Sequence, residues 1–221
     1  MTADTVLTQL FIGTLRPLPP EGQLTGIYKL PINNTIQINE LGLIGDYQAD
    51  KRVHGGAEKA IHHYAAENYA QLAAQYPHEA QQFVAGSLGE NLSSIGLHEH
   101  NVCIGDIYQL GDCTLQVSQP RSPCWKINHK FGIEKLSLFI QEHNITGWYY
   151  RVLQAGKLNQ GDSFKRISCP NPHLTIAYFW QNVLEHRPEI SQLEAIAHAE
   201  GLSPQWQKRL TDRIAWLRQH P

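Results

Sequence analysis

The first 168 residues consist largely of short apolar or alternating runs that are separated by turn residues. Gly-Asp pairs recur between these runs, and each pair is compatible with a turn or bend. The runs cover residues 6–12, 25–30, 35–38, 102–110, 114–117, 152–154 and 163–167. Many short strands with regularly spaced turns are typical of a β-barrel or β-sandwich, so this part is predicted to be mainly β.

Two segments interrupt this pattern with a helical one. Residues 57–76 contain no proline before Pro77, and their apolar side chains recur at helical spacing. These side chains are Ile61, Tyr64, Ala65, Leu72 and Tyr76. The spacing predicts a helix within residues 57–76, and a second helix is predicted around residues 134–142.

The pattern changes at residues 169–172, where the sequence Cys-Pro-Asn-Pro breaks regular structure because each proline removes a backbone donor. Three amphipathic helices are predicted beyond it, and their apolar stripes are expected to contact a core or a second copy. The first helix covers residues 174–184. The second begins at a Ser191/Glu194 capping box and ends before Gly201, and the third begins at Ser203-Pro204. The chain is therefore predicted to divide into residues 1–169 and a three-helix subdomain at 170–221, and a homodimer is possible.

The charge balance excludes one class of partner. Lys and Arg number 18 against 20 Asp and Glu, which gives a formal net charge of −2. A protein of this charge is not expected to bind a nucleic acid polymer, since such binding needs many cations at phosphates. No apolar run reaches the length of a membrane span. A signal peptide would require a positively charged start, but no Lys or Arg precedes Arg16. The expected location is the cytoplasm, with no membrane partner.

The four cysteines are scattered and form no C-x-x-C pair, which removes the support for zinc-finger and iron–sulfur sites. Cys103 and Cys113 lie among apolar neighbours and are predicted to be small buried side chains. Cys169 adjoins the proline break and is assigned no role. Cys124 differs from these three because of its neighbours.

Cations gather around a glycine pair at residues 51–64, the first candidate site. Gly55 and Gly56 allow the backbone N–H groups to turn toward an anion, and Lys51, His54 and Lys59 add positive charge, as does Arg52. In the predicted helix that follows, Lys59 and His63 share a face, whereas His62 and His63 point to different sides. This combination predicts a site for an anionic ligand such as a phosphate, and the alternative is a solvated glycine turn.

The second candidate site is the loop at residues 118–126. Pro120 and Pro123 stiffen it, and Arg121 and Lys126 flank Cys124. Nearby cations favour the thiolate, which is the form that attacks a substrate or binds a metal. Cys124 is therefore predicted to be a nucleophile or a metal ligand, and the alternative is a buried cysteine behind an aromatic side chain.

A third segment places Glu90 and Asn91 after a glycine turn at residues 86–89. On the residues alone, this is a turn that leads into a strand. Most of the 12 histidines show no metal-ligand spacing.

Taken in order, several motifs resemble the MOSC (molybdenum cofactor sulfurase C-terminal) family, and closely its YiiM-like bacterial branch. They are Gly42-Leu43-Ile44-Gly45-Asp46, Lys51-x-Val53-His54-Gly55-Gly56, Lys59-Ala60, Gly89-Glu90-Asn91-Leu92, Gly105-Asp106 and Pro120-Arg121-x-Pro123-Cys124. The resemblance covers nearly the whole chain and implies a MOSC-type β-barrel followed by an accessory helical domain. It also implies that a molybdenum–pyranopterin cofactor is bound within the barrel part, with Cys124 as the molybdenum ligand.

The resemblance further implies which residues hold this anionic, phosphate-bearing cofactor. They are Lys51, His54, Gly55, Gly56, Lys59, Glu90, Asn91 and Arg121. The implied activity is the reduction of small N-hydroxylated compounds, including N-hydroxylated purine bases, to amines. His54 or His63 is the expected proton donor, and electrons are expected from a separate flavin or iron–sulfur reductase. Two alternatives stay open: a carrier of the cofactor or its sulfur without turnover, and a cysteine hydrolase or transferase that pairs Cys124 with a histidine.

Overall fold

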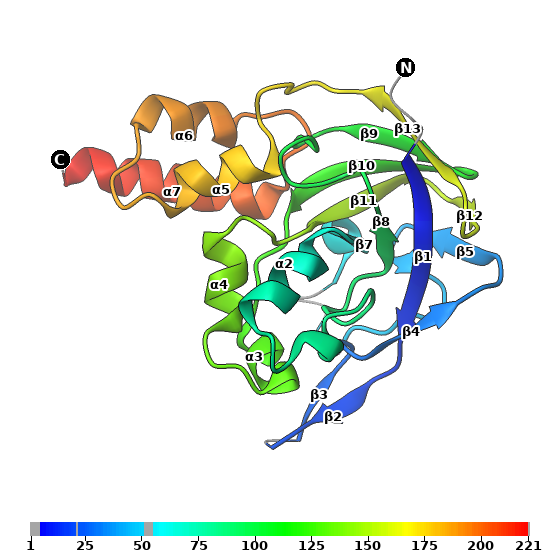
Figure 1. Cartoon of the computed structure of the whole chain (residues 1–221). Coiled ribbons are helices and arrows are strands. Elements are labelled where there is room, and N and C mark those ends of the chain that lie inside the picture. The colour runs from blue at the N-terminus through cyan, green and yellow to red at the C-terminus, as the bar shows by residue number, and fades with distance from the viewer. Residues whose placement is uncertain (1–4, 21, 51–54, 221) are drawn as a thin grey trace.

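The computed structural model describes residues 5–20, 22–50 and 55–220 of the chain (Figure 1). Lys51 and His54, which the sequence places in the candidate site, lie outside the described residues. The same holds for Arg52.

Seven strands form a closed barrel, which confirms the predicted fold class. They are β1 (Thr5–Gly13), β7 (Ile61–Ala65), β8 (Leu92–Ser94), β9 (Ile107–Leu110), β10 (Cys113–Pro120), β11 (Trp148–Gln154) and β13 (Ser163–Ser168). The order around the ring is β13-β9-β10-β11-β7-β8-β1, and β1 returns to β13 where Thr5 pairs with Phe164. Neighbouring strands are antiparallel except for β7 and β8, which are parallel.

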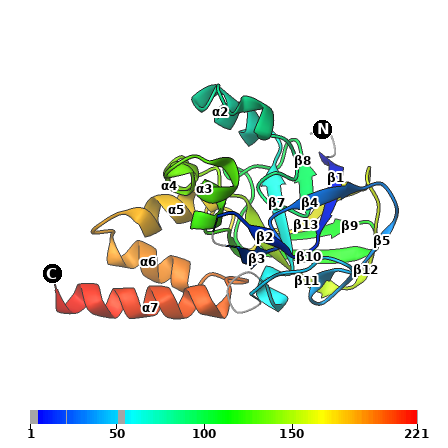
Figure 2. The same ribbon diagram turned by 90° about the horizontal axis from the view of Figure 1, so that it is seen from below.

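Shorter elements surround the barrel (Figures 1 and 2). The strands are β2 (Arg16–Leu18) with β3 (Gln23–Thr25), β4 (Lys29–Ile32) on β1, and a small sheet of β5 (Ile36–Asn39), β6 (Gly42–Leu43) and β12 (Gly156–Leu158). The helices are α2 (Asn68–Gln75), α3 (Trp125–Phe131), α4 (Leu136–Glu142) and two 3-10 turns, η1 (Ala57–Lys59) and η2 (Ala80–Gln82). The helices α2, α3 and α4 pack around one hydrophobic cluster that includes Leu72, Ile127 and Leu136.

The predicted helix at residues 57–76 is wrong over most of its length. Only Asn68–Gln75 is α-helical, while Ile61–Ala65 is the strand β7 between β11 and β8. All five residues of β7 are buried, because it is covered on both faces. A strand buried on both faces loses the alternation that identifies a half-exposed strand, and its apolar positions then imitate helical spacing.

Two other predictions near the site had different outcomes. The helix predicted around residues 134–142 is confirmed as α4. The sequence reading missed α3, which begins directly after Cys124, and the strand predicted at residues 102–110 starts only at Ile107.

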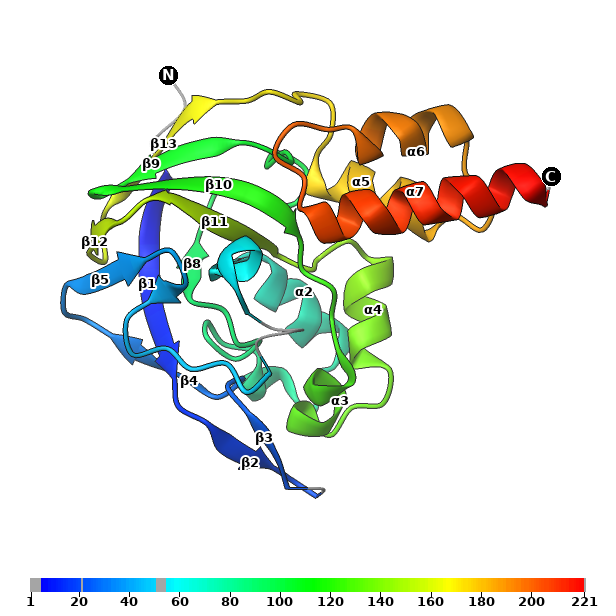
Figure 3. The same ribbon diagram turned by 180° about the vertical axis from the view of Figure 1, so that it is seen from behind.

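The C-terminal tail contains α5 (Ile176–Leu184), α6 (Ile190–Ala197) and α7 (Pro204–Gln219), as predicted, and Figure 3 shows it beside the barrel. Ser203 occupies the N-cap position of α7 and Pro204 its first turn, which confirms the predicted start of this helix, although Ser203 Oγ makes no capping hydrogen bond. The capping box at Ser191 is wrong, because Ser191 lies inside α6 and Glu189 occupies its N-cap position. None of the helices in the described residues is long and apolar enough to cross a membrane.

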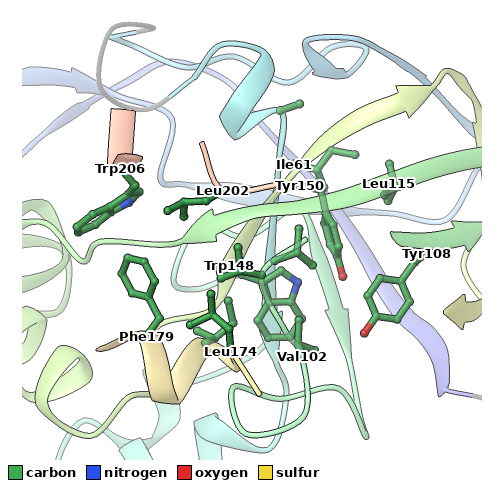
Figure 4. Packing of buried hydrophobic residues seen from close by; sticks show 14 of the residues in the cluster. Ile61, Val102, Tyr108, Leu115, Trp148, Tyr150, Leu174, Phe179, Leu202 and Trp206 are labelled. Atoms are coloured by element: carbon green, nitrogen blue, oxygen red, sulfur yellow. The ribbon is translucent and has the colours of Figure 1, made fainter. Parts of the chain in front are cut away.

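One hydrophobic core runs from the barrel into the tail. Trp148 and Val102 of the barrel part belong to the same cluster as Leu174, Phe179 and Trp206 (Figure 4). Trp180 of α5 also donates from Nε1 to Thr146 Oγ1 at 3.0 Å. The predicted boundary at residues 169/170 falls between β13 and α5, and the core continues across it.

Candidate functional site

A pocket at one side of the barrel brings together four of the residues that the sequence analysis selected. Lys59, Asn91, Arg121 and Cys124 all line it. They arrive from η1, from the loop before β8 and from the loop after β10. The remaining wall comes from residues within 25–29, 46–49 and 88–89, from His62, from Lys126 and from Tyr149.

Lys29 and Asp46 form a buried ion pair in this wall that the sequence analysis did not select. Lys29 Nζ lies 2.5 and 2.6 Å from the two carboxylate oxygens of Asp46, and the side chains are only 6% and 1% exposed. Burial lowers the pKa of Lys29, and the attraction of Asp46 opposes that shift. This ion pair was not predicted for two reasons. Asp46 belongs to a Gly-Asp pair that was interpreted as a turn, and Lys29 lies in a different segment that only the fold brings close to it.

Asn91 connects this pair to β7. Its Oδ1 accepts from the backbone N–H of His62 at 3.1 Å, and its Nδ2 donates to Asp46 Oδ2 at 2.9 Å. Nδ2 also donates to the backbone oxygen of Phe11 at 3.2 Å. The amide of Asn91 thus links two segments of the pocket wall, at Asp46 and His62, to the strand β1.

Glu90 does not line the pocket, although the next residue does. Its buried carboxylate accepts from Tyr69 Oη and from the backbone N–H of Gly86, both at 2.6 Å. Burial raises the pKa of Glu90, and these hydrogen bonds oppose that shift. In the structure, Glu90 fixes the turn at residues 86–89.

The pocket wall is strongly cationic. Among the described residues it contains Lys29, Lys59, Arg121 and Lys126, against the single carboxylate of Asp46. Arg121 is 6% exposed and donates from Nη2 to the backbone oxygen of Leu88 at 3.3 Å. Its Nη1 is buried and has no hydrogen-bond partner among the described residues. A buried guanidinium N–H without a partner is costly, so an anion in the pocket would stabilise this arrangement.

Cys124 is half-buried and stands at the N-cap position of α3, with extended backbone angles of φ −119° and ψ 161°. The loop that carries it leaves β10 at Pro120, and the backbone N–H of Arg121 donates to Gly147 O at 3.0 Å. This hydrogen bond anchors the loop three residues before the thiol.

The glycine pair does not line the pocket in the described part of the chain. Gly56, at φ +88°, precedes only the three-residue turn η1, and β7 follows at once. The expected helix beginning after Gly55 and Gly56 is therefore absent here, and with it the helix dipole that was expected to attract an anion. Lys59 reaches the pocket from the end of η1 and donates from Nζ to Gln205 Oε1 of α7 at 3.0 Å.

His63 and His62 alternate along β7 and point to opposite sides of the barrel wall. His63 is buried in the core, where Nδ1 lies 3.1 Å from Tyr150 Oη and Nε2 lies 2.8 Å from Ser94 Oγ. Burial lowers the pKa of His63 to about 3. Its ring does not line the pocket, so the structure does not bring it together with Cys124 or with Lys59.

His62 is the histidine that lines the pocket in the described part of the chain. Its ring centroid lies 5.3 Å from that of Tyr149. Burial and the charge of Arg121 lower the pKa of His62 well below 6.5. His62 was not predicted, because a helix over this segment places His63, four residues after Lys59, on the side of that lysine. In the strand β7, it is His62 that faces the pocket.

We expect His63 to make the stability of the protein depend on pH. Between its folded pKa of about 3 and its ordinary value of 6.5, the unfolded chain binds a proton that the folded chain does not. The free energy of unfolding therefore falls as the pH drops below 6.5, by about 1.4 kcal/mol per pH unit from this group. The lowered pKa of His62 acts in the same direction.

His63→Gln should flatten this slope by about 1.4 kcal/mol per pH unit between about pH 5.5 and pH 4. Urea unfolding at a series of pH values measures it. His78→Gln, at an exposed position, is the matched control and should leave the slope unchanged. Equal slopes for His63→Gln and the unaltered chain would contradict the assignment.

A second groove adjoins the pocket and shares Lys59, Cys124 and Tyr149 with it. The tail lines its other side with Gln205, Trp206 and Arg209. Arg209 lies over the Trp206 ring, 4.7 Å from the centroid. The described lining of the pocket itself comes from the barrel part, as expected, while α7 lines the adjoining groove beside Cys124.

The comparisons with known proteins agree with this architecture. The model of the MOSC domain matches residues 50–165. Protein YiiM of Escherichia coli (strain K12) is 38% identical over 198 residues, which cover 88% of this chain and 86% of YiiM. A protein from Gibberella moniliformis named "Reductase" is 35% identical over 173 residues, which cover 77% of this chain but 31% of that protein.

Solved structures show the same likeness over the whole chain. The crystal structure of YiiM from Escherichia coli superposes with a TM-score of 0.81 at 29% identity, over 96% of this chain and 92% of that chain. YiiM from Geobacillus stearothermophilus gives a TM-score of 0.81 at 28% identity, over 95% and 99%. The matched barrel, the pocket around Cys124 and the helical tail lead to one conclusion: this chain belongs to the MOSC domain family.

Proposed function

We propose that this protein is a molybdenum-cofactor-dependent reductase that converts small N-hydroxylated compounds, such as N-hydroxylated purine bases, to amines. The observation that carries the proposal is the half-buried thiol of Cys124 at a pocket with four cations in its wall. The family is associated with the molybdenum cofactor, and one relative is named a reductase. When bound, the cofactor supplies two-electron redox chemistry at its metal.

The pocket fits an anionic cofactor on the evidence of its own residues. Arg121 presents a buried N–H group that no described residue accepts, and Lys126 and Lys59 line the same space. Guanidinium and ammonium groups are suited to phosphate. These three side chains would hold the phosphate-bearing part. Cys124 would provide the thiolate ligand to molybdenum, since thiolates suit soft transition metals. We retain Lys51 and His54 as proposed contacts on the sequence alone.

The second groove suits the substrate. The residues that line it include Trp125, Tyr149 and Trp206, together with Gln119 and Arg209. A planar base can stack on an aromatic ring and form hydrogen bonds with an amide or a guanidinium. We therefore propose that the substrate reaches Cys124 from the side of the tail, while the cofactor fills the barrel side.

His62 replaces His63 as our proposed proton donor, beside His54. It lines the pocket, and its low pKa arises from burial and from nearby Arg121. An anion bound at Arg121 would raise the pKa of His62, because negative charge favours the protonated ring. Cofactor binding would thus favour the protonated ring of His62, which could then donate the proton that the reaction needs. The electrons would come from a separate flavin or iron–sulfur reductase.

Two measurements test this function. The protein is produced in a host that makes the molybdenum cofactor, and its metal content is determined. It is then assayed with an N-hydroxylated purine and a reduced viologen dye as electron source. We expect near-stoichiometric molybdenum and amine formation. A carrier would retain molybdenum without turnover, and a metal-free preparation from such a host would contradict both the enzyme and the carrier.

We expect substitutions in α7 to alter substrate binding and not cofactor binding. Arg209→Ala should raise the KM about 2- to 12-fold, which corresponds to one hydrogen bond worth ~0.5–1.5 kcal/mol, and leave the molybdenum content unchanged. Steady-state kinetics and metal analysis measure the two effects. Lys208→Ala, on the same helix but paired with Asp212, should change neither. A fall in molybdenum content with Arg209→Ala would show that the groove does not belong to the substrate.

A further inference from the structure

A second group of potential metal ligands lies outside the pocket. Ligand atoms of Cys103, Asp106 and Cys169 all lie within 4.8 Å of one another. Cys103 and Asp106 come from the turn before β9, and Cys169 directly follows β13. The group therefore lies where the barrel ends and the chain turns into the tail, and it shares no residue with the pocket around Cys124.

The carboxylate of Asp106 is already oriented for a ligand. Asp106 is fully buried, and its Oδ2 accepts from the backbone N–H of Cys103 at 3.0 Å, Tyr108 Oη at 3.1 Å and Arg166 Nη1 at 3.3 Å. Its Oδ1 is buried and has no hydrogen-bond partner among the residues that the structure describes. Outer hydrogen bonds that fix one oxygen and leave the other for a cation are typical of metal-binding carboxylates.

The turn that carries two of the ligands has the spacing of a zinc site. Cys103 and Asp106 stand three positions apart, as the two cysteines of a C-x-x-C zinc turn do. The backbone N–H of Asp106 donates to Cys103 O at 3.1 Å and closes the turn. Gly105 adopts the positive φ of +83° that this turn needs. A Cβ at this position would lie 2.3 Å from Glu200 O of the tail, so a larger residue would not fit.

Backbone pairing fixes the turn against the tail. Ile104 N donates to Leu174 O at 2.9 Å, and Ile176 N donates to Val102 O at 3.0 Å. Leu174 and Ile176 follow Cys169 by five and seven positions, so the segment that pairs with the turn begins shortly after the third ligand. Cys103 is buried, whereas Cys169 is half-buried, which leaves a route for an ion from solvent.

We propose that Cys103, Asp106 and Cys169 bind one divalent cation of the zinc class, which ties the start of the tail to the barrel. Two thiolates and one carboxylate select zinc-like metals over Mg²⁺ or Ca²⁺, which prefer oxygen ligands. Each thiol loses its proton on binding. A water or a nearby carbonyl completes the coordination. The site is structural, and it is independent of the proposed reductase function.

The test uses the full chain carrying Cys124→Ser, so that the pocket thiol cannot bind the probe, under a phosphine reductant. Zn²⁺ is titrated calorimetrically, and Co²⁺ is followed by its thiolate charge-transfer absorption. We expect one equivalent of either ion and a rise in Tm with Zn²⁺. Adding Cys169→Ser should weaken Zn²⁺ binding at least tenfold and make the rise in Tm smaller at the same Zn²⁺ concentration.

Two further variants separate the ligands from other cysteines and carboxylates. Asp106→Asn should also weaken binding, whereas Cys113→Ala, at a buried thiol outside the group, should not. Binding that Cys169→Ser leaves unchanged would overturn the proposal. The absence of one-to-one binding by the reduced protein would also overturn it. In that case, a disulfide between Cys103 and Cys169 that forms in air and is lost under the reductant would be the alternative role of the two thiols.

Discussion

Replacing Cys124 by serine should remove molybdenum from the protein and abolish its turnover of N-hydroxylated substrates. The side chain is half-buried at the start of α3, so the substitution should not disturb the fold. A serine hydroxyl stays protonated at neutral pH and is a poor ligand for a metal that prefers thiolate. Without the thiolate, only the cationic wall holds the cofactor, and molybdenum is expected to be lost together with the cofactor during purification.

Metal analysis and the viologen-coupled assay measure this loss together. Cys113→Ala is the matched control, since it removes a thiol that is fully buried in β10. Burial raises the pKa of Cys113 to about 11, which keeps it a thiol at neutral pH. The control should keep both molybdenum and turnover. If Cys124→Ser kept full turnover, the assignment of the metal ligand would be wrong.

Removing the charge of Arg121 should weaken cofactor binding by a larger factor than removing any other cation of the pocket wall. Arg121→Met keeps the length of the side chain and leaves the phosphate without its buried partner. Loss of one member of a buried hydrogen-bonded charge pair costs about 2–5 kcal/mol. That cost corresponds to roughly a 30- to 4,000-fold weaker affinity. Buried pairs are poorly screened, so the loss should persist at high salt.

The measurement is the molybdenum that remains after extensive gel filtration, at low and at high salt. Arg213→Met removes an arginine that contacts the backbone of the tail instead, and it should retain the cofactor. Arg121→Lys should recover part of the affinity, because it restores the charge without the two-pronged geometry. Full occupancy in Arg121→Met would refute the electrostatic account of the pocket.

The barrel and the tail were predictable from the sequence because most of their elements have one face toward solvent. Alternation revealed β1 and β13, and the Ser203-Pro204 pair revealed the start of α7. β7 escaped prediction because both of its faces are buried, so its apolar positions carry no period of two. The helix α3 escaped because the loop signal of the prolines before Cys124 hid the helix that follows.

The candidate site was predictable only where its residues cluster along the chain. The segment 118–126, which was predicted to be a loop and also includes the end of β10 and the start of α3, contains Arg121, Cys124 and Lys126, and all three line the pocket. The pair of Lys29 and Asp46 arises from two loops that are adjacent only after folding. The contribution of α7 was missed because its residues lie some 80 positions beyond Cys124 in the sequence. Spatial neighbours at such separations leave no local pattern.

The pairing of β1 with β13 has a consequence during synthesis of the chain. Thr5 finds its partner Phe164 only after nearly the whole barrel sequence has been made. At about 5–20 residues per second, β1 waits roughly 8–32 s on the ribosome before that edge can be covered. Its other neighbours, β4 and β8, emerge earlier and can pair with it first. Until β13 arrives, the nascent barrel keeps an open strand edge that chaperones can recognise.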